Sequence, residues 1–128
     1  MKVFHGRVDG APSEQRSDTF TGTVWADPIM PATDGVSINH VCFSPGGRTN
    51  WHSHGGGQTL QVTAGKGWIC KDGEAPQMIR TGDVVWIGPN ERHWHGAADT
   101  SYMVHIATSI GKALWQDPVT DKDYPSQG

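Results

Sequence analysis

A chain of 128 residues has the size of one ordinary domain, and we expect a single globular unit. Its net charge of −3 comes from mixed signs without a basic stripe, which argues against a nucleic-acid partner. No apolar run approaches the roughly 18 residues of a membrane span, and the first residues lack the apolar core of a signal peptide, so the sequence predicts a cytoplasmic protein.

The chain is rich in residues that favour turns, with 17 glycines and 8 prolines, and it lacks apolar periodicity of helical length. This composition is typical of many short strands joined by tight turns, as in a β-sandwich or a β-barrel. Residues 1–18 are polar and irregular, which indicates an N-terminal arm. The barrel is expected over residues 19–112, with strands predicted at 20–26, 36–43, 50–54, 58–64, 68–71, 77–80, 83–87, 93–97 and 101–109. Residues 113–128 are expected to form a C-terminal tail packed on or near the barrel, with room for a short helical turn at 113–124.

Two of the seven histidines mark the first candidate site. His52 and His54 are two residues apart in a predicted strand, so both side chains leave the same face. Gln58 has the same parity and follows a glycine-rich turn that can fold the next strand back beside the first. Two imidazoles and one amide oxygen can then converge at about 2 Å from a divalent ion. A pair of surface histidines on an edge strand is the alternative that this motif alone leaves open.

A second segment, an apolar strand followed by a tight turn and His93, favours the metal site over a pair of surface histidines. Together the two segments resemble the cupin superfamily. Its first motif, Gly-x5-His-x-His-x3-Glu-x6-Gly, matches Gly46, His52, His54, Gln58 and Gly65, and its second, Gly-x5-Pro-x-Gly-x2-His-x3-Asn, matches Gly82, Gly88, Asn90, His93 and Ala97. The chain departs from the motifs at Gln58, Gly88, Asn90 and Ala97, and Asn90 still tolerates the left-handed turn that glycine would supply. The resemblance implies an all-β, single-domain jelly-roll β-barrel with one divalent metal ion per subunit on His52, His54, Gln58 and His93.

The glutamine at position 58 affects the chemistry more than the other departures. A neutral amide in place of a carboxylate leaves the charge of the ion uncompensated, which makes it a stronger Lewis acid toward a bound hydroxyl, water or carbonyl. A cupin that has lost its metal is the alternative interpretation of this substitution. Three histidines bind a metal well without a carboxylate, and all three are present.

The resemblance narrows to the small bacterial monocupins that include the manganese-dependent (R)-selective hydroxynitrile lyases. The matching segments are 20–24, 47–54, 57–60, 62–65, 82–86, 93–98 and 119–121. In that subgroup glutamine is the normal third ligand of the first motif. The resemblance therefore implies a lyase that cleaves a carbon–carbon bond in a hydroxyl-bearing small molecule, with manganese as the expected metal and iron, nickel or zinc as alternatives.

The same resemblance assigns further pocket residues. It directs Asn39, Val41 and Phe43 toward the ion, and it maps the catalytic histidine onto His105, with Met103 on the same face. A neutral imidazole at His105 can take a proton from a substrate hydroxyl, although a buried histidine tied to a backbone carbonyl is an equal alternative. His95 shares the parity of His93 and is expected to orient a ligand or to lie at the rim. The lyases carry a glutamine where this chain has Ser109, which places cyanide handling in question.

Two other classes of function stay open at this point. One is a metal-dependent dioxygenase or decarboxylase, which the absence of an evident carboxylate near the ligands disfavours. The other is a non-catalytic barrel that binds a small molecule. Because cupin strands leave open edges, we expect the chain to form a homodimer or a homotetramer.

Overall fold

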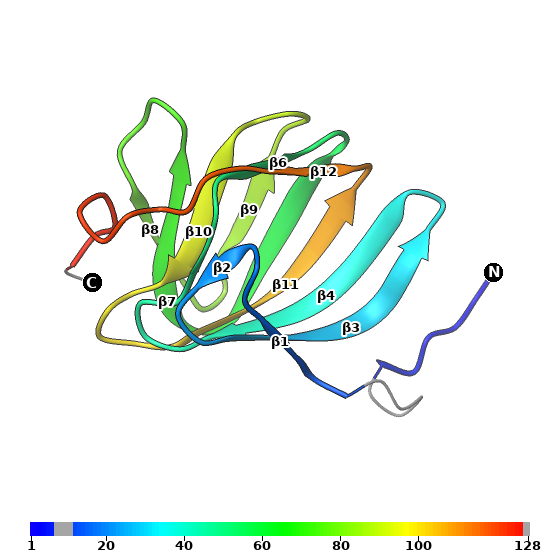
Figure 1. Cartoon of the computed structure of the whole chain (residues 1–128). Helices are drawn as coiled ribbons and strands as arrows, with labels where there is room; N and C mark the ends of the chain where they lie inside the picture. The colour runs from blue at the N-terminus through cyan, green and yellow to red at the C-terminus, as the bar shows by residue number, and fades with distance from the viewer. Residues whose placement is uncertain (7–11, 127–128) are drawn as a thin grey trace.

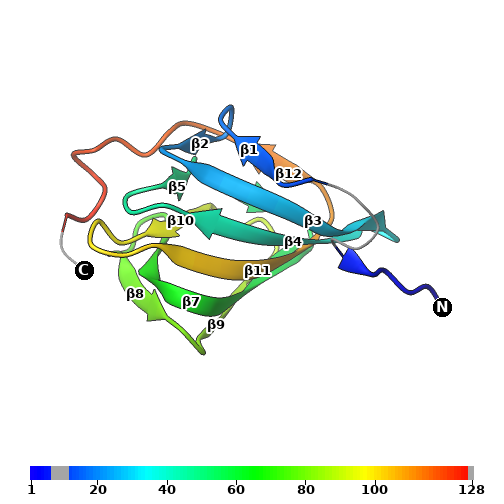
Figure 2. The same cartoon turned by 90° about the horizontal axis from the view of Figure 1, so that it is seen from below.

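Antiparallel strands account for the regular structure of this chain. The computed structural model describes residues 1–6 and 12–126, and in that part of the chain the strands form a nearly closed β-barrel without an α-helix (Figure 1, Figure 2). The all-β barrel predicted from the sequence is confirmed. Among the described residues there is no helix of the length and apolarity that a membrane crossing needs.

Twelve strands follow one another along the described chain. They are β1 (Glu14–Arg16), β2 (Phe20–Thr21), β3 (Val24–Thr33), β4 (Val36–Phe43), β5 (Arg48–Thr49), β6 (His52–His54), β7 (Gly57–Lys71), β8 (Gln77–Arg80), β9 (Val84–Ile87), β10 (His93–Ala97), β11 (Met103–Ile110) and β12 (Ala113–Trp115). The first and last lie in segments expected to be an irregular arm and a tail with a helical turn. Both are strands because they pair with residues distant in sequence, β1 with β3 and β12 with β6.

The barrel wall runs in the order β1-β3-β4-β11-β7-β10-β5-β2, and Figure 1 shows β3, β4, β11 and β7 side by side. The barrel consists of two sheets, its two walls, and β7 belongs to both. Its first part pairs with β11 and β9 in one sheet, and its second part pairs with β10 and β8 in the other. Between the two parts, a Cβ atom at Gly65 or Gly67 would collide with the carbonyl oxygen of Tyr102 or Gly96. The predicted break between residues 64 and 68 is therefore wrong, because these glycines let one strand pass from wall to wall.

The predicted end of a strand at residue 26 is also wrong. β3 continues through Pro28 to Thr33, with shifts of register at Pro28 and Met30. Proline is tolerated here because, among the described residues, β1 pairs with residues 24–26 alone, so the rest of β3 lies at an edge of the described sheet, where proline is accepted.

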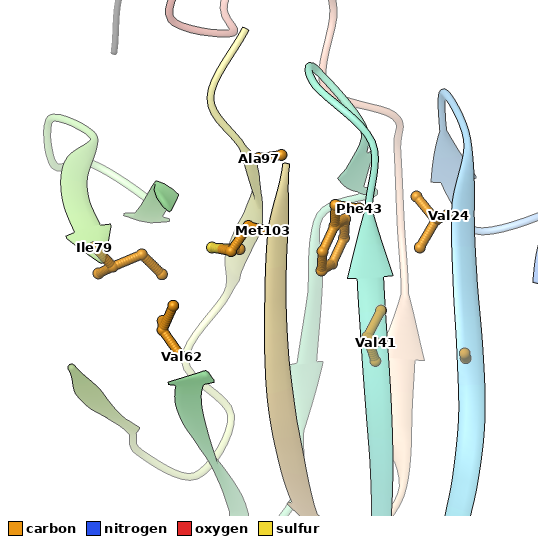
Figure 3. Packing of buried hydrophobic residues seen from close by; sticks show 8 residues of the cluster. Val24, Val41, Phe43, Val62, Ile79, Ala97 and Met103 are labelled. Atoms are coloured by element: carbon orange, nitrogen blue, oxygen red, sulfur yellow. The ribbon is translucent and has the colours of Figure 1, made fainter. Parts of the chain in front are cut away.

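An apolar cluster fills the space between the walls. Its side chains come from six strands, β3, β4, β7, β8, β10 and β11; they are Val24, Ala26, Val41, Phe43, Val62, Ile79, Ala97 and Met103, and the labelled side chains in Figure 3 point toward one another. Each fully buried valine, isoleucine, phenylalanine or methionine of this kind stabilises a fold by about 1.5–3 kcal/mol. The Phe43 ring also lies 5.1 Å from the ring of His105 and 5.9 Å from that of His95, so the apolar core borders a group of buried histidines.

A buried arginine fixes the segment that follows β12. Arg48 on β5 donates from Nε and Nη2 to the Val119 carbonyl oxygen, at 3.0 and 2.7 Å, and its Nη2 also pairs with the Asp121 carboxylate at 2.7 Å. The guanidinium lies 4.6 Å from the centre of the Tyr124 ring, whose hydroxyl donates to the Ala97 carbonyl. These contacts hold the end of the chain against β5 and β10.

Candidate metal centre

The fold brings the four sequence-predicted ligands together. His93 on β10 lies directly opposite His52 on β6 in the antiparallel register, and their ring centroids are 4.2 Å apart. The His54 ring lies 5.1 Å from that of His52 and 5.9 Å from that of His93. Gln58, at the start of β7, places its Oε1 atom 3.1 Å from His93 Nε2. Their roles as ligands stay a prediction, and their convergence makes that prediction geometrically feasible.

The turn before β10 holds this arrangement in register. Asn90 has a φ angle of 62°, the left-handed conformation that the sequence predicted it would tolerate. From that turn its backbone N–H donates to the His54 carbonyl oxygen at 2.8 Å. One hydrogen bond thus ties the second cupin-like motif to the strand that carries the first.

Hydrogen bonds determine which ring nitrogen of His52 and of His93 is available to bind a metal. His52 Nδ1 lies 2.9 Å from the Asn50 carbonyl oxygen, and His93 Nδ1 lies 2.8 Å from that of Glu91. A carbonyl oxygen only accepts, so each Nδ1 carries the proton and each Nε2 carries the lone pair. This is the tautomer in which Nε2 binds a metal while a backbone carbonyl orients the ring.

The unsatisfied atoms of the cluster fit a bound cation. With His93 Nδ1 protonated, the lone pair of His93 Nε2 faces the Gln58 carbonyl oxygen, and two acceptors at 3.1 Å have no proton to share. Both ring nitrogens of His54 are buried without a hydrogen-bond partner. Buried polar atoms without partners are rare, and a divalent ion among these lone pairs would satisfy them. The residues present therefore fit the divalent metal that the resemblance implies.

Burial keeps the cluster neutral. Desolvation, followed by the proximity of His93, lowers the pKa of His54 to about 4 and that of His52 well below the usual value. Burial also lowers the pKa of His93. Neutral imidazole is the form that binds a metal, so these histidines need lose no proton near neutral pH to become ligands.

Two further histidines extend the cluster into the barrel. Nitrogens of His52, His93 and His95 lie within 4.8 Å of one another, and His95 is only 3% exposed, so it is interior and not at the rim. His95 Nδ1 lies 3.0 Å from Nε2 of His105, which is fully buried. His95 Nε2 and His105 Nδ1 have no hydrogen-bond partner. Burial is the main cause that lowers the pKa of both residues, to about 4 for His105.

A cavity of about 260 Å³ opens beside these residues, and His52, His54, Gln58, His95 and His105 line it. The predicted pocket residues Asn39, Val41 and Ser109 also line it, whereas Phe43 and Met103 belong to the apolar core. Strand parity gives the correct face for those two, but they sit at the packed part of the barrel. Ser109 lies opposite Gln58 in the β11–β7 register, and its Oγ accepts a hydrogen bond of 2.9 Å from Gln58 Nε2.

The sequence did not indicate the residues that the first and last strands of the chain contribute to the cavity. Arg16 of β1, Phe20 of β2 and Trp115 of β12 line it. The Trp115 ring stacks on His52, with centroids 4.3 Å apart and planes at 22°, and lies 5.7 Å from Phe20. These residues reach the cavity through strand pairings that are distant in sequence, and their residue types alone did not indicate it.

Known proteins share the fold and sequence of this chain to different degrees. The family described as Cupin domain matches residues 39–109. An (R)-mandelonitrile lyase from Granulicella tundricola is 50% identical over 114 residues, which cover 84% of this chain and 87% of that protein. A cupin-like protein from Thermotoga maritima is 39% identical with a TM-score of 0.84, over 97% of this chain and 95% of that one. The polyketide cyclase RemF from Streptomyces resistomycificus is 16% identical with a TM-score of 0.73, over 98% and 90% of the two chains, and that likeness shows the fold alone.

Proposed function

Because this chain belongs to the cupin domain family, we propose that it is a metal-dependent lyase that cleaves the carbon–carbon bond beside a hydroxyl group. The reaction we infer is that of a hydroxynitrile lyase, which splits a hydroxynitrile into an aldehyde and hydrogen cyanide. The relative named (R)-mandelonitrile lyase supports this choice, at 50% identity. The observation that carries it is the contact between His95 and His105 beside the candidate ligands, because it supplies an acceptor for the hydroxyl proton.

A divalent ion held by His52, His54, Gln58 and His93 would act as a Lewis acid on the substrate hydroxyl and lower its pKa. The chain contributes a neutral donor set to that chemistry. None of the residues that line the cavity, in the part of the chain that the structure describes, is acidic. The charge that develops on the substrate oxygen is therefore not opposed by a nearby carboxylate.

The two inner histidines form a path for the proton. When His95 Nδ1 donates to His105 Nε2, the unpartnered His95 Nε2 carries a lone pair. A hydroxyl proton accepted there allows the Nδ1 proton of His95 to pass to His105 Nε2 across 3.0 Å. His105 then holds the added charge, which agrees with the catalytic role that the resemblance gave it.

Burial makes this charged state short-lived. The pKa of His105 lies near 4, so the protonated pair readily gives its proton up. In the proposed reaction the carbon–carbon bond breaks as the oxygen becomes a carbonyl, and its electron pair leaves with cyanide. The pair returns its proton to cyanide, which leaves as hydrogen cyanide, so atoms and charge balance without an oxidant.

Cleavage of (R)-mandelonitrile, followed as benzaldehyde release, tests the proposal. We expect turnover without oxygen in protein loaded with manganese, and comparison with iron and zinc identifies the preferred metal. Replacing His105 with phenylalanine should leave the metal content unchanged and lower kcat by at least about 100-fold. The matched control is His5→Phe, a change at an exposed histidine of the N-terminal arm.

The alternatives give different results in the same assay. Turnover that requires oxygen would indicate a dioxygenase and refute the lyase. Binding of benzaldehyde without turnover, under either atmosphere and with each of the three metals, would indicate a barrel that binds small molecules without reacting them.

A further inference from the structure

One fixed charge stands at the wall of the metal cavity. Eighteen of the described residues line the cavity, and Arg16 is the only arginine, lysine, aspartate or glutamate among them. A guanidinium is charged at every accessible pH and has five donors arranged to bind a carboxylate. A bound divalent ion would add further positive charge to a cavity whose described lining residues include no acidic one. The interior therefore favours a negatively charged molecule.

Arg16 lies where the cavity meets the outside. Arg16 and Trp115 also line a second hollow, formed by residues 14–19 of the N-terminal arm. The acidic residues Glu14 and Asp18 line that outer hollow and not the metal cavity. An anionic group is thus repelled on the outer side of Arg16 and attracted on its inner side.

The present partner of Arg16 can be exchanged. Its Nη2 lies 3.2 Å from Glu14 Oε2, but the two side chains are 39% and 53% exposed. Ion pairs exposed to this degree contribute little to stability, because water and salt screen them. A ligand carboxylate can share or replace Glu14 at the guanidinium without unfolding the arm.

Aromatic rings flank the same entrance. Trp115 is 38% exposed while it stacks on His52, and it lies beside Phe20. A flat ring can lie against such side chains between the histidine cluster and Arg16. The aromatic side chains thus line the cavity together with the histidine cluster and Arg16.

We propose that the substrate carries a carboxylate at the end remote from its hydroxyl, and that this carboxylate binds Arg16 while an aromatic ring lies against Trp115. The part of this inference that concerns the substrate hydroxyl rests on the proposed lyase function, whereas the part that concerns the carboxylate does not. Arg16 is a residue that determines substrate specificity, and it takes no part in breaking the bond.

Calorimetric titration of the metal-free protein tests the carboxylate end without turnover. The probes are 4-formylbenzoate and its neutral isostere 4-formylbenzamide. We expect the carboxylate to bind about tenfold more tightly than the amide. Arg16→Gln should abolish that preference, Arg16→Lys should keep part of it, and Glu14→Gln should increase it by freeing the guanidinium. Arg80→Gln, which removes an exposed arginine outside the cavity, should leave it unchanged.

Kinetics separate this inference from the proposed function. The measured quantity is the ratio of kcat/KM for 4-carboxymandelonitrile to that for mandelonitrile, which Arg16→Gln should lower about tenfold, chiefly through KM. Equal turnover of both nitriles by wild type and variant would overturn the carboxylate site and leave the lyase standing. A calorimetric preference lost in Arg16→Gln, with neither nitrile cleaved, would support the carboxylate site and refute the lyase. Equal binding of both probes by the wild-type protein would overturn the inference outright.

Discussion

Replacing Ser109 with alanine removes the hydroxyl that accepts the Gln58 amide hydrogen bond at 2.9 Å. Gln58 is only 4% exposed, and an unsatisfied buried donor costs about 1–3 kcal/mol. The metal-free protein escapes most of this cost, because the amide can turn and donate to the lone pair of His93 Nε2. The metal-bound protein cannot, since Gln58 Oε1 must then face the ion. The penalty therefore falls on metal binding, whose affinity should drop by about 5- to 150-fold.

Competition with a chelator measures that affinity for manganese. Ser109→Thr keeps the hydroxyl and should bind the metal as tightly as the wild type. If the alanine variant lost affinity because the barrel loosened in general, the threonine variant would not restore it. The matched control is Ser37→Ala, because Ser37 lies opposite Ser109 in the β4–β11 register and lines the same cavity. A Ser109→Ala protein with the affinity of the wild type would refute the role given to this hydrogen bond.

Replacing any one of the three candidate ligand histidines with alanine should remove the metal and leave the circular dichroism unchanged, and full occupancy in two such variants by elemental analysis would refute the assignment. The Tm of the metal-free chain should fall as the pH drops from about 6.5 to 4. Burial holds the pKa of His54 and His105 near 4, so the unfolded chain takes up protons in this range before the folded chain does. A Tm that rises in this range would contradict the conclusion that the buried imidazoles are neutral. The chain should form a homodimer or homotetramer, because Val84 and Trp86 on β9 are 67% and 59% exposed, and a monomer in light scattering at micromolar concentration would exclude this.

Motif spacing predicted the centre of the site because it depends on local geometry. His52 and His54 share a face by strand parity, and their positions relative to Gln58 follow from one turn. The pairing of His93 with His52 is not local, yet the resemblance supplied it, and the register agrees. The convergence of these four side chains could therefore be predicted from the sequence, and their role as ligands stays a prediction.

The cavity entrance was not predictable in the same way. Arg16 reaches the cavity because β1 pairs with β3, and Trp115 because β12 pairs with β6. Strands of three residues are too short to show periodicity, so neither pairing leaves a pattern in the sequence. Parity also gives a face but not a position along the barrel, which explains why Phe43 and Met103 lie in the core beyond the cavity.

Replacing Gln58 with glutamate separates the two metal-dependent chemistries. The added carboxylate, beside His93 Nε2 at the candidate metal position, should tighten metal binding and make the ion a weaker Lewis acid. A lyase that must ionise the substrate hydroxyl should then keep its metal and lose turnover. An oxygen-dependent enzyme should tolerate the change, because glutamate is the residue of the cupin motif at this position. Metal content and turnover measured on one preparation decide the matter, and undiminished anaerobic cleavage by Gln58→Glu would defeat the electrostatic reason for a glutamine here.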